Sequence, residues 1–323
     1  MKSWWLTDGA GGSRMELRDV PVPSPKAGEV LIKVHAASLN RGEFLHSPGY
    51  HSSASARPAG SDTAGEIEAL GEGVTGWKIG ERVMGRSSGA YSEYAVSDAR
   101  LLSPVPAALS WSEAAAVPIV FGVTYDMLWT QGQLKPGEWL LVTGISSGVG
   151  VACLQAAKAL GARVIGTSGS KAKLQRLGSL GLDVAIETRS PDFSGRVLEA
   201  TAGKGVDLVV NNVGGSLFAE CIASMNYKGR LATVGYLDKV FKAELDLNAL
   251  HAKRLRVFGV SARYRPMAEA AEAAANFRRD LLPAFADGRI KPVVDKVFPL
   301  GRLPEARAYM EADAQVGKVV LSV

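Results

Sequence analysis

The residues with the clearest chemical potential lie in mid-chain, between Thr143 and Gly150. Three glycines fall within seven positions there, directly after the apolar run at 139–142. An Ala- and Leu-rich run to residue 160 follows, and Gly161 precedes a second apolar run. This order predicts a strand, a tight turn, a helix and a second strand. Glycines in such a turn let the backbone approach a ligand, and the amides that open the helix attract an anion. The pyrophosphate of a dinucleotide is the usual occupant.

The same residues match three different motifs. Thr143, Gly144, Gly148 and Gly150 have the spacing of the nucleotide turn of short-chain dehydrogenases. Gly144-x-Ser146-x-Gly148 has the spacing of the nucleophile elbow of α/β-hydrolases, with serine as nucleophile. The third interpretation is a glycine-rich dinucleotide turn that follows a separate N-terminal domain.

The surroundings favour the third interpretation. The short-chain motif lies near the N-terminus and needs a tyrosine followed four positions later by lysine, which this chain lacks. A hydrolase needs a late histidine as base, and His251, the only histidine after the turn, lies among basic residues.

The end of the second predicted strand indicates which dinucleotide binds. An NAD site carries Asp or Glu about 20 residues past the glycines, where it holds the ribose 2′-hydroxyl. Here residues 166–173 offer hydroxyl groups and lysines and no carboxylate. Lysine and serine hold a 2′-phosphate, which a carboxylate repels. The sequence therefore favours NADPH over NADH.

Two domains must position these residues. Residues 1–122 show short predicted strands (29–36, 64–70, 80–85 and 89–96) and a long loop at 39–58, as in a small β-barrel. A capping box at Ser110 starts a helix, and a second helix is expected at 122–131. Strands and helices then alternate to residue 260, which predicts a parallel sheet covered on both faces. We expect one helix at 267–286 and a final strand at 317–323 that returns to the first domain. The predicted domains are therefore 1–122 with 263–323, and 123–262.

The bulk composition excludes several classes of protein. At 323 residues two domains are expected, and 47% hydrophobic with 21% charged residues is ordinary for a globular protein. No apolar run is long enough to span a bilayer, and the N-terminus turns polar too early for a signal peptide. The net charge of +5 is spread along the chain, so a dedicated nucleic-acid module is not expected.

The cysteines and histidines do not predict a metal site. Cys153 and Cys221 are the only cysteines, which fits a cytoplasmic protein, and both fall in apolar helices as core residues. The histidines have no zinc-ligand spacing with each other or with the cysteines: His35, His46, His51 and His251.

Several short motifs occur in the order of one known family. They are Val30-Leu31-Ile32-Lys33-Val34, Pro58-x-Gly60-Ser61-Asp62, Gly80-Glu81-Arg82-Val83, Gly89-Ala90-Tyr91, Ser147-Gly148-Val149-Gly150, Gly229-Arg230 and Gly317-Lys318-Val319-Val320-Leu321. Over nearly its whole length the chain resembles the zinc-independent quinone oxidoreductase (zeta-crystallin-like) branch of the medium-chain dehydrogenase/reductases. Zinc-dependent relatives carry Gly-His-Glu at 60–62 and a cysteine cluster, and both are missing here.

The resemblance implies a fold, a cofactor and a set of site residues. The fold is α/β, with a GroES-like β-rich barrel and a doubly wound parallel sheet of Rossmann type, and the implied form is an NADPH-binding homodimer. Asn40 and Thr124 match positions near the nicotinamide, and Tyr50 matches a tyrosine of the same loop as Asn40, one residue closer than is usual. Matches to cofactor-binding segments are Ser146, Ser147, Gly148, Val149 and Gly150 at the pyrophosphate, Ser168, Gly169 and Lys173 at the 2′-phosphate, and Val234, Gly235, Tyr236 and Ser261 after later strands.

The implied reaction is hydride transfer from NADPH to a quinone or another conjugated carbonyl compound, without metal. Donors such as Asn40, Tyr50 or backbone amides would stabilise the negative charge that develops on the acceptor oxygen. No residue carries the signature of a general acid, and water is one source of the proton. An enone or enoyl reductase of the same superfamily, and an NADPH-binding stress or structural protein with little turnover, are the alternatives.

Overall fold

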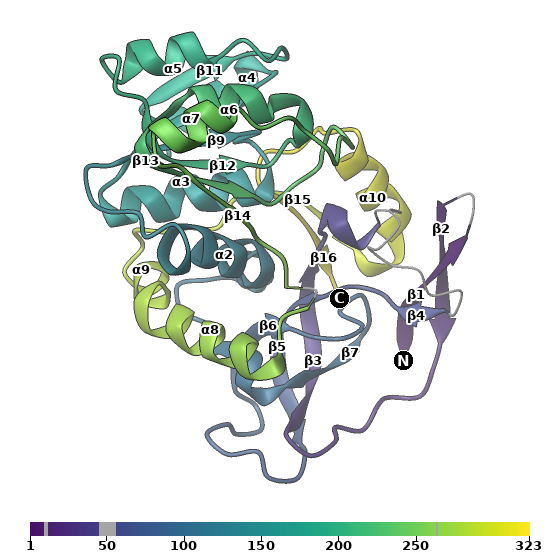
Figure 1. Ribbon diagram of the computed structural model, residues 1–323. Coiled ribbons are helices and arrows are strands. Elements are labelled where there is room, and N and C mark those ends of the chain that lie inside the picture. The colour runs from purple at the N-terminus through teal and green to yellow at the C-terminus, as the bar shows by residue number, and fades with distance from the viewer. Residues whose placement is uncertain (10–11, 45–55, 263) are drawn as a thin grey trace. The chain divides into compact units, whose positions relative to one another are not determined.

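The computed structural model describes residues 1–9, 12–44, 56–262 and 264–323, without the side chains of residues 8, 9, 12 and 13. The chain divides into two compact units (Figure 1). Unit 1 contains Met1–Ile119 and Met267–Val323, and unit 2 contains Val120–Pro266.

Unit 1 is built mainly on antiparallel strands. Its larger sheet has the order β15-β16-β3-β5-β6-β8, with β7 also paired to β3, and β2-β1-β4 form a second sheet. The strands are β1 (Lys2–Gly9), β2 (Gly12–Asp19), β3 (Glu29–Ser38), β4 (Arg57–Pro58), β5 (Asp62–Leu70), β6 (Arg82–Arg86), β7 (Tyr94–Asp98), β8 (Leu102–Pro104), β15 (Val294–Pro299) and β16 (Lys318–Ser322). The helical segments are η1 (Arg41–Glu43), η2 (Ala99–Leu101), α1 (Trp111–Ala115), α8 (Met267–Asp280), α9 (Leu282–Ala286), η5 (Leu300–Arg302) and α10 (Leu303–Glu311).

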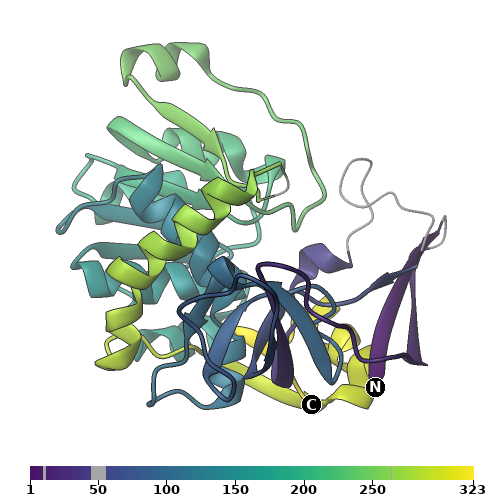
Figure 2. The ribbon, with the colours of Figure 1, turned by 90° about the horizontal axis from the view of Figure 1, so that it is seen from below.

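The C-terminal strand completes the sheet of the N-terminal segment. β16 pairs antiparallel with β3, where Val320 lies opposite Ser38, and the two run side by side in both ribbon views (Figures 1 and 2). β3 is rich in valine and isoleucine and buries most of its residues, as expected for a central strand. The predicted return of the last strand to the first domain is confirmed.

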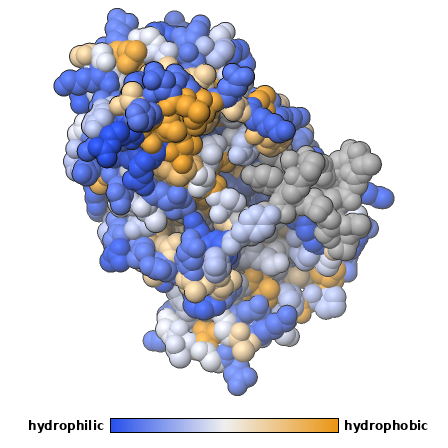
Figure 3. Space-filling view, viewed as in Figure 1, coloured by the Kyte–Doolittle hydropathy of each residue, from blue (hydrophilic) through white to orange (hydrophobic). Residues whose placement is uncertain are grey.

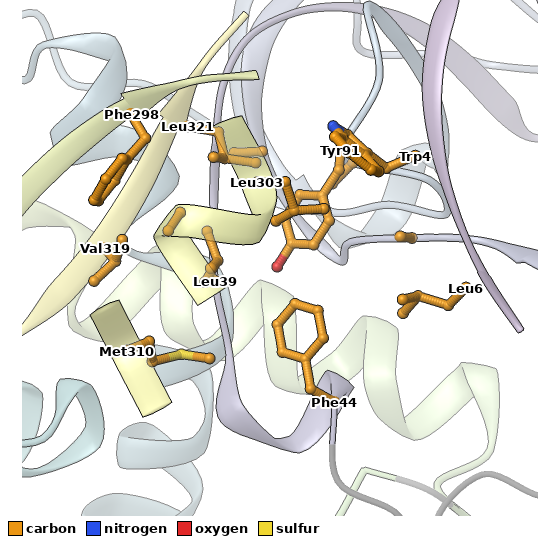
Figure 4. Close-up of a cluster of buried hydrophobic side chains, with 14 of the residues drawn as sticks. Trp4, Leu6, Leu39, Phe44, Tyr91, Phe298, Leu303, Met310, Val319 and Leu321 are labelled. Carbon is orange, nitrogen blue, oxygen red and sulfur yellow. The ribbon is translucent and has the colours of Figure 1, made fainter. Parts of the chain in front are cut away.

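One hydrophobic core of unit 1 surrounds Tyr91. It gathers side chains from the first strand, β16 and α10, among them Trp4, Leu303 and Leu321 (Figure 4). A Cβ atom on Gly60 would lie 2.6 Å from the backbone nitrogen and ring of Tyr91, so this approach requires glycine. Tyr91 is thereby held against the segment that leads into β5.

Unit 2 is a six-stranded parallel sheet in the order β11-β10-β9-β12-β13-β14. Its strands are β9 (Trp139–Thr143), β10 (Arg163–Ser168), β11 (Val184–Glu187), β12 (Val206–Asn211), β13 (Met225–Thr233) and β14 (Arg256–Gly259). Its helical segments are α2 (Pro118–Tyr125, which begins at the unit border), η3 (Asp126–Thr130), α3 (Gly148–Leu160), α4 (Lys171–Gly178), α5 (Ser194–Ala200), η4 (Gly215–Leu217), α6 (Phe218–Ala223) and α7 (Leu247–Ala252).

The strand order explains why helices cover both faces of this sheet. From β9 the chain first proceeds toward β11 and later toward β14, and right-handed crossovers in opposite directions leave on opposite faces. Side chains of α5, α6 and α7 pack with Leu141, Ile165 and Val209 on one face. The fold is thus an α/β protein with a β-rich unit and a doubly wound parallel sheet, as predicted.

Three predicted elements differ from the structure. The helix expected at 267–286 is two helices, because Pro283 has no amide hydrogen to continue the first one and instead sits in the first turn of α9. The strand expected at 89–96 is wrong before residue 94, since Tyr91 donates its backbone N–H to Ala59 rather than to a ladder. The helix expected at 122–131 begins at Pro118 and ends in a π-helical turn, η3.

Candidate functional site

The candidate cofactor residues gather at one edge of the unit 2 sheet. Since all six strands are parallel, residues that follow their carboxyl ends share that edge. The glycine turn follows β9, Ser168 and Gly169 end β10, residues 234–236 follow β13, and Ser261 follows β14. Strand order reverses between β9 and β12, and ligands of doubly wound sheets bind at such a reversal.

The turn after β9 is held in one conformation. Gly144 has a φ of +61°, which favours glycine, and Ser147 caps α3 by accepting a hydrogen bond from the Gly150 amide at 3.0 Å. A Cβ atom on Gly150 would lie 2.5 Å from the carbonyl oxygen of Ile145. Gly150 therefore lets the first turn of α3 pack on the loop, and the helix amino end faces the sheet edge.

Side-chain hydrogen bonds fix β9 and β12 beside this turn. The Thr143 hydroxyl donates to Asn211 Oδ1 at 3.0 Å and accepts from the Asn212 amide at 3.0 Å. The backbone N–H groups of Val234 and Gly235 donate to the Asn211 carbonyl at 3.2 and 3.3 Å. The candidate segment 234–236 thus lies next to the end of β12.

An arginine that the sequence did not single out lies at the predicted 2′-phosphate region. A Cβ atom on Gly169 would be 2.7 Å from Cγ and 2.9 Å from Nε of Arg189, so the guanidinium group lies against the Gly169 backbone. Ser170 caps α4 by accepting from the Lys173 amide at 3.4 Å. Arg189 follows β11, the strand paired with β10. A basic residue just after a neighbouring parallel strand was the only available sequence signal.

Asn40 lies in unit 1 at the end of β3, with its side-chain amide fully engaged. Nδ2 donates to Asp62 at 2.9 Å and to Glu43 at 3.4 Å, and Oδ1 accepts from the Lys318 ammonium at 2.6 Å. No amide hydrogen of Asn40 is left for a substrate oxygen.

Asn40 belongs to a buried polar network that the sequence analysis missed. Asp62 is fully buried and accepts from the Ser38 hydroxyl at 2.9 Å, from the Ile119 amide at 2.8 Å and from Lys318 at 3.3 Å. The hydroxyl of Tyr91 donates to Glu43. The available signal was a charged residue directly before a run of small residues, Asp62 before Thr63-Ala64-Gly65.

The remaining candidates have diverse surroundings. Thr124 is fully buried in α2, with its hydroxyl 3.5 Å from Cys153 Sγ. Tyr236 is partly buried and its ring lies 5.0 Å from that of Phe241, and Ser261 is exposed. Tyr50 lies outside the described residues.

The two cysteines are core residues, as predicted. Both are free and buried. Burial raises the pKa of the Cys153 thiol to about 12 and raises the pKa of Cys221 as well. Neither thiol is therefore a nucleophile at neutral pH.

Within the described parts of the chain, no three His, Cys, Asp or Glu side chains are grouped so that they could hold a metal ion. In the same residues no helix is both long and apolar enough to cross a membrane.

Models of known protein families match a part of each unit. Residues 26–107 match the family model "Alcohol dehydrogenase GroES-like domain", and residues 148–277 match "Zinc-binding dehydrogenase". The chain is 30% identical over 308 residues to quinone oxidoreductase of Rattus norvegicus, covering 94% of this chain and 92% of that protein. It is 31% identical over 336 residues to acryloyl-coenzyme A reductase of Metallosphaera sedula, covering 95% and 96%.

A longer relative and a solved structure complete the comparison. The chain is 30% identical over 320 residues to a phenolphthiocerol/phthiocerol polyketide synthase of Mycobacterium tuberculosis, of which it spans only 14%. It matches the structure of mycobacterial Rv1454c complexed with NADPH over 100% of both chains, with 29% identity and a TM-score of 0.90.

Proposed function

We propose that this chain, which belongs to the medium-chain dehydrogenase/reductase superfamily, uses NADPH to reduce a quinone or a related conjugated carbonyl compound without metal. It is an oxidoreductase of that superfamily, with an NAD(P)-binding Rossmann domain and a GroES-like domain. The proposed catalytic domain is 1–122 with 263–323, and the proposed NADPH-binding domain is 123–262.

The proposal of NADPH rather than NADH rests on the positively charged side chains near the carboxyl end of β10. The Arg189 guanidinium lies against Gly169, Lys173 is in the first turn of α4, and residues 166–173 contain no carboxylate. A dianionic 2′-phosphate fits these groups. The glycine turn and the amino end of α3 fit a pyrophosphate.

The bound cofactor supplies the hydride, and the chain's own residues bind and orient the reactants. The turn at 146–150 would hold the pyrophosphate, and 234–236 with Ser261 would line the remainder. Since the amide hydrogens of Asn40 are engaged by Asp62 and Glu43, we propose that Asn40 packs beside the nicotinamide as a fixed surface. We propose that Tyr50 or backbone amides then stabilise the negative charge that develops on the acceptor oxygen. For Thr124 we propose a packing contact near the ring.

The substrate class is tested with purified protein and three acceptors: 1,2-naphthoquinone, 9,10-phenanthrenequinone and a simple enone. Turnover of the quinones supports the proposal, whereas turnover of the enone alone supports the second candidate, an enoyl reductase, which the acryloyl-coenzyme A reductase relative favours. Binding of NADPH with no turnover would favour a stress or structural role.

Added chelator should leave the rate unchanged, and inhibition would contradict a metal-free reaction.

Replacing Lys173 with Glu should raise the KM for NADPH far more than that for NADH. The change puts a carboxylate beside the 2′-phosphate, and one lost charge-assisted hydrogen bond is worth about 1.5–3 kcal/mol, or about 10-fold to 150-fold in affinity. Arg189→Glu should act in the same direction. Lys204→Glu, at an exposed lysine elsewhere in unit 2, is the matched control. Equal effects of Lys173→Glu on the two cofactors would contradict the phosphate role.

We further propose that the protein is a cytoplasmic homodimer. β14 is an edge strand of the unit 2 sheet and exposes Val257, and an unpaired edge can pair with a second copy. Figure 3 shows apolar side chains gathered on the surface of this unit. The large hydrophobic residues that the described part of unit 2 exposes are Tyr227, Leu237, Val240, Phe241, Leu247, Val257 and Tyr264. Sedimentation of the wild type and of Val257→Glu measures the association.

A further inference from the structure

The long connection between β13 and α7, residues 234–246, contains no helix or strand. A connection of this length without regular structure is uncommon in a compact domain and is usually functional. Its first three residues belong to the proposed cofactor site. Backbone hydrogen bonds of 3.2 and 3.3 Å from Val234 and Gly235 to the Asn211 carbonyl hold its beginning, and a second attachment follows at Asp238.

Asp238 ties this connection to the loop that follows β12. Its Oδ2 accepts a hydrogen bond from the Ser216 backbone N–H at 2.8 Å and another from the Ser216 hydroxyl at 2.5 Å. Its own backbone N–H donates to the Val213 carbonyl at 3.0 Å. One residue therefore makes three hydrogen bonds between two loops that both lie at the carboxyl edge of the sheet.

The other carboxyl oxygen of Asp238 shapes its own loop. Oδ1 accepts from the Val240 backbone N–H at 2.8 Å, which closes a turn around Lys239. Lys239 has a φ of +60°, a conformation that is uncommon for a residue other than glycine. The Val240 carbonyl then accepts from the Gly215 N–H at 2.9 Å. The turn and the loop after β12 are thus bonded to each other on both sides of Lys239.

The loop after β12 has room for this carboxyl group because of Gly214. Its φ is +129°, in the region that favours glycine, and a Cβ atom there would overlap Oδ1 of Asp238. Asn211, the last residue of β12, holds Gly214 in place, since its Oδ1 accepts from the Gly214 N–H at 3.1 Å and its Nδ2 donates to the Gly214 carbonyl at 2.8 Å. Asp238 is therefore bonded to a loop that is itself fixed to the sheet.

The place of β13 in the sheet indicates which half of the cofactor its loop serves. β10, whose end is proposed to hold the 2′-phosphate, and β13 lie on opposite sides of β9 and β12. They are three places apart, or roughly 14 Å at about 4.8 Å per strand. A dinucleotide whose pyrophosphate lies at the strand-order reversal extends its two halves in opposite directions. The adenosine half then lies toward β10 and the nicotinamide half toward β13.

We propose that Asp238 is a positioning residue of the cofactor site, which holds residues 234–236 where the nicotinamide half of NADPH binds. This inference rests on the proposed binding of NADPH. Asp238 acts through the loop rather than by contact with the cofactor, because its oxygens accept from Ser216 and Val240. Without these bonds the loop would become ordered only when the cofactor binds, and the cost of that ordering would lower the affinity.

Titration of the full chain with NADPH and with adenosine 2′,5′-bisphosphate tests the inference. The second ligand carries the 2′-phosphate and lacks the nicotinamide half. Asp238→Ala should raise the dissociation constant of NADPH about 10-fold to 100-fold and leave that of adenosine 2′,5′-bisphosphate unchanged. Gly214→Ala should act in the same direction, since its Cβ displaces the Asp238 carboxyl group. Asp238→Asn keeps one oxygen acceptor and should restore part of the lost affinity.

Asp246→Ala is the matched control for Asp238→Ala. Asp246 lies at the other end of the same connection and caps α7 by accepting from the Ala249 N–H at 2.9 Å. Loss of this cap should lower the thermal unfolding temperature. Because the cap bond runs to α7 and not to the loop after β12, this variant should bind both ligands as the wild type does.

The outcomes separate this inference from the function on which it rests. If Asp238→Ala weakens both ligands equally, or binds NADPH as the wild type does, Asp238 is not a positioning residue, and NADPH binding stands. Should Asp238→Ala not fold, the same comparison is decided by Gly214→Ala and Asp238→Asn. A wild type that binds neither ligand would contradict the proposed function, and this inference would fall with it.

Discussion

Gly150→Ala should lose NADPH affinity and stability together. The added Cβ would lie 2.5–2.6 Å from backbone atoms of Ile145, which cannot move aside as a flexible side chain can. To relieve this steric overlap the first turn of α3 must shift. The shift displaces the amide groups proposed to hold the pyrophosphate. Overpacking of this kind costs about 1–3 kcal/mol, equivalent to about 5-fold to 150-fold in the dissociation constant. Quenching of protein fluorescence on NADPH titration, with thermal unfolding of the same samples, measures both.

Gly178→Ala is the matched control for that change. Gly178 ends α4 in the same unit, and a Cβ there meets nothing within 4 Å. Alanine is the better helix former by about 1 kcal/mol in a helix interior, so this variant should be no less stable than the wild type. Wild-type NADPH affinity of Gly150→Ala would show that the turn does not hold the cofactor in the proposed way.

Lys318→Met should destabilise unit 1 more than any surface substitution. Methionine keeps most of the volume but removes the ammonium group that contacts Asp62, Asn40 and the Leu39 carbonyl. Asp62, with no exposed surface, then keeps a buried charge without its cationic partner. Breaking a buried pair by removal of one member costs about 3–5 kcal/mol. Urea unfolding of the full chain measures the loss, and the exposed Lys78 supplies the control Lys78→Met.

A double variant separates lost charge balance from lost packing. Asp62→Asn together with Lys318→Met removes both charges, and it should be more stable than Lys318→Met alone. Should Lys318→Met unfold at the urea concentration of Lys78→Met, the pair would contribute nothing to the fold. A double variant that is less stable than Lys318→Met would assign the loss to packing.

The features that the sequence determined are local ones. The turn after β9 was predictable because its glycines, the apolar run before it and the helix after it lie within about twenty residues, and each carries its own periodicity or backbone requirement. Ser110 was predictable as a helix cap because a capping box joins residues only three apart. The last strand, β16, was predictable as a strand because its own short run is apolar.

Tertiary structure alone decided which distant polar residues meet. Glu43, Asp62, Tyr91 and Lys318 come from four separate segments, and the pairing of β16 with β3 and of β3 with β5 brings those segments together. Arg189 reaches Gly169 only because β11 lies beside β10. A strand's register and neighbours are set by burial of the whole sheet, so no local pattern of residues encodes them. The sequence therefore predicted a dinucleotide turn from neighbouring residues, and only the fold brought Glu43, Asp62 and Lys318 into one buried network.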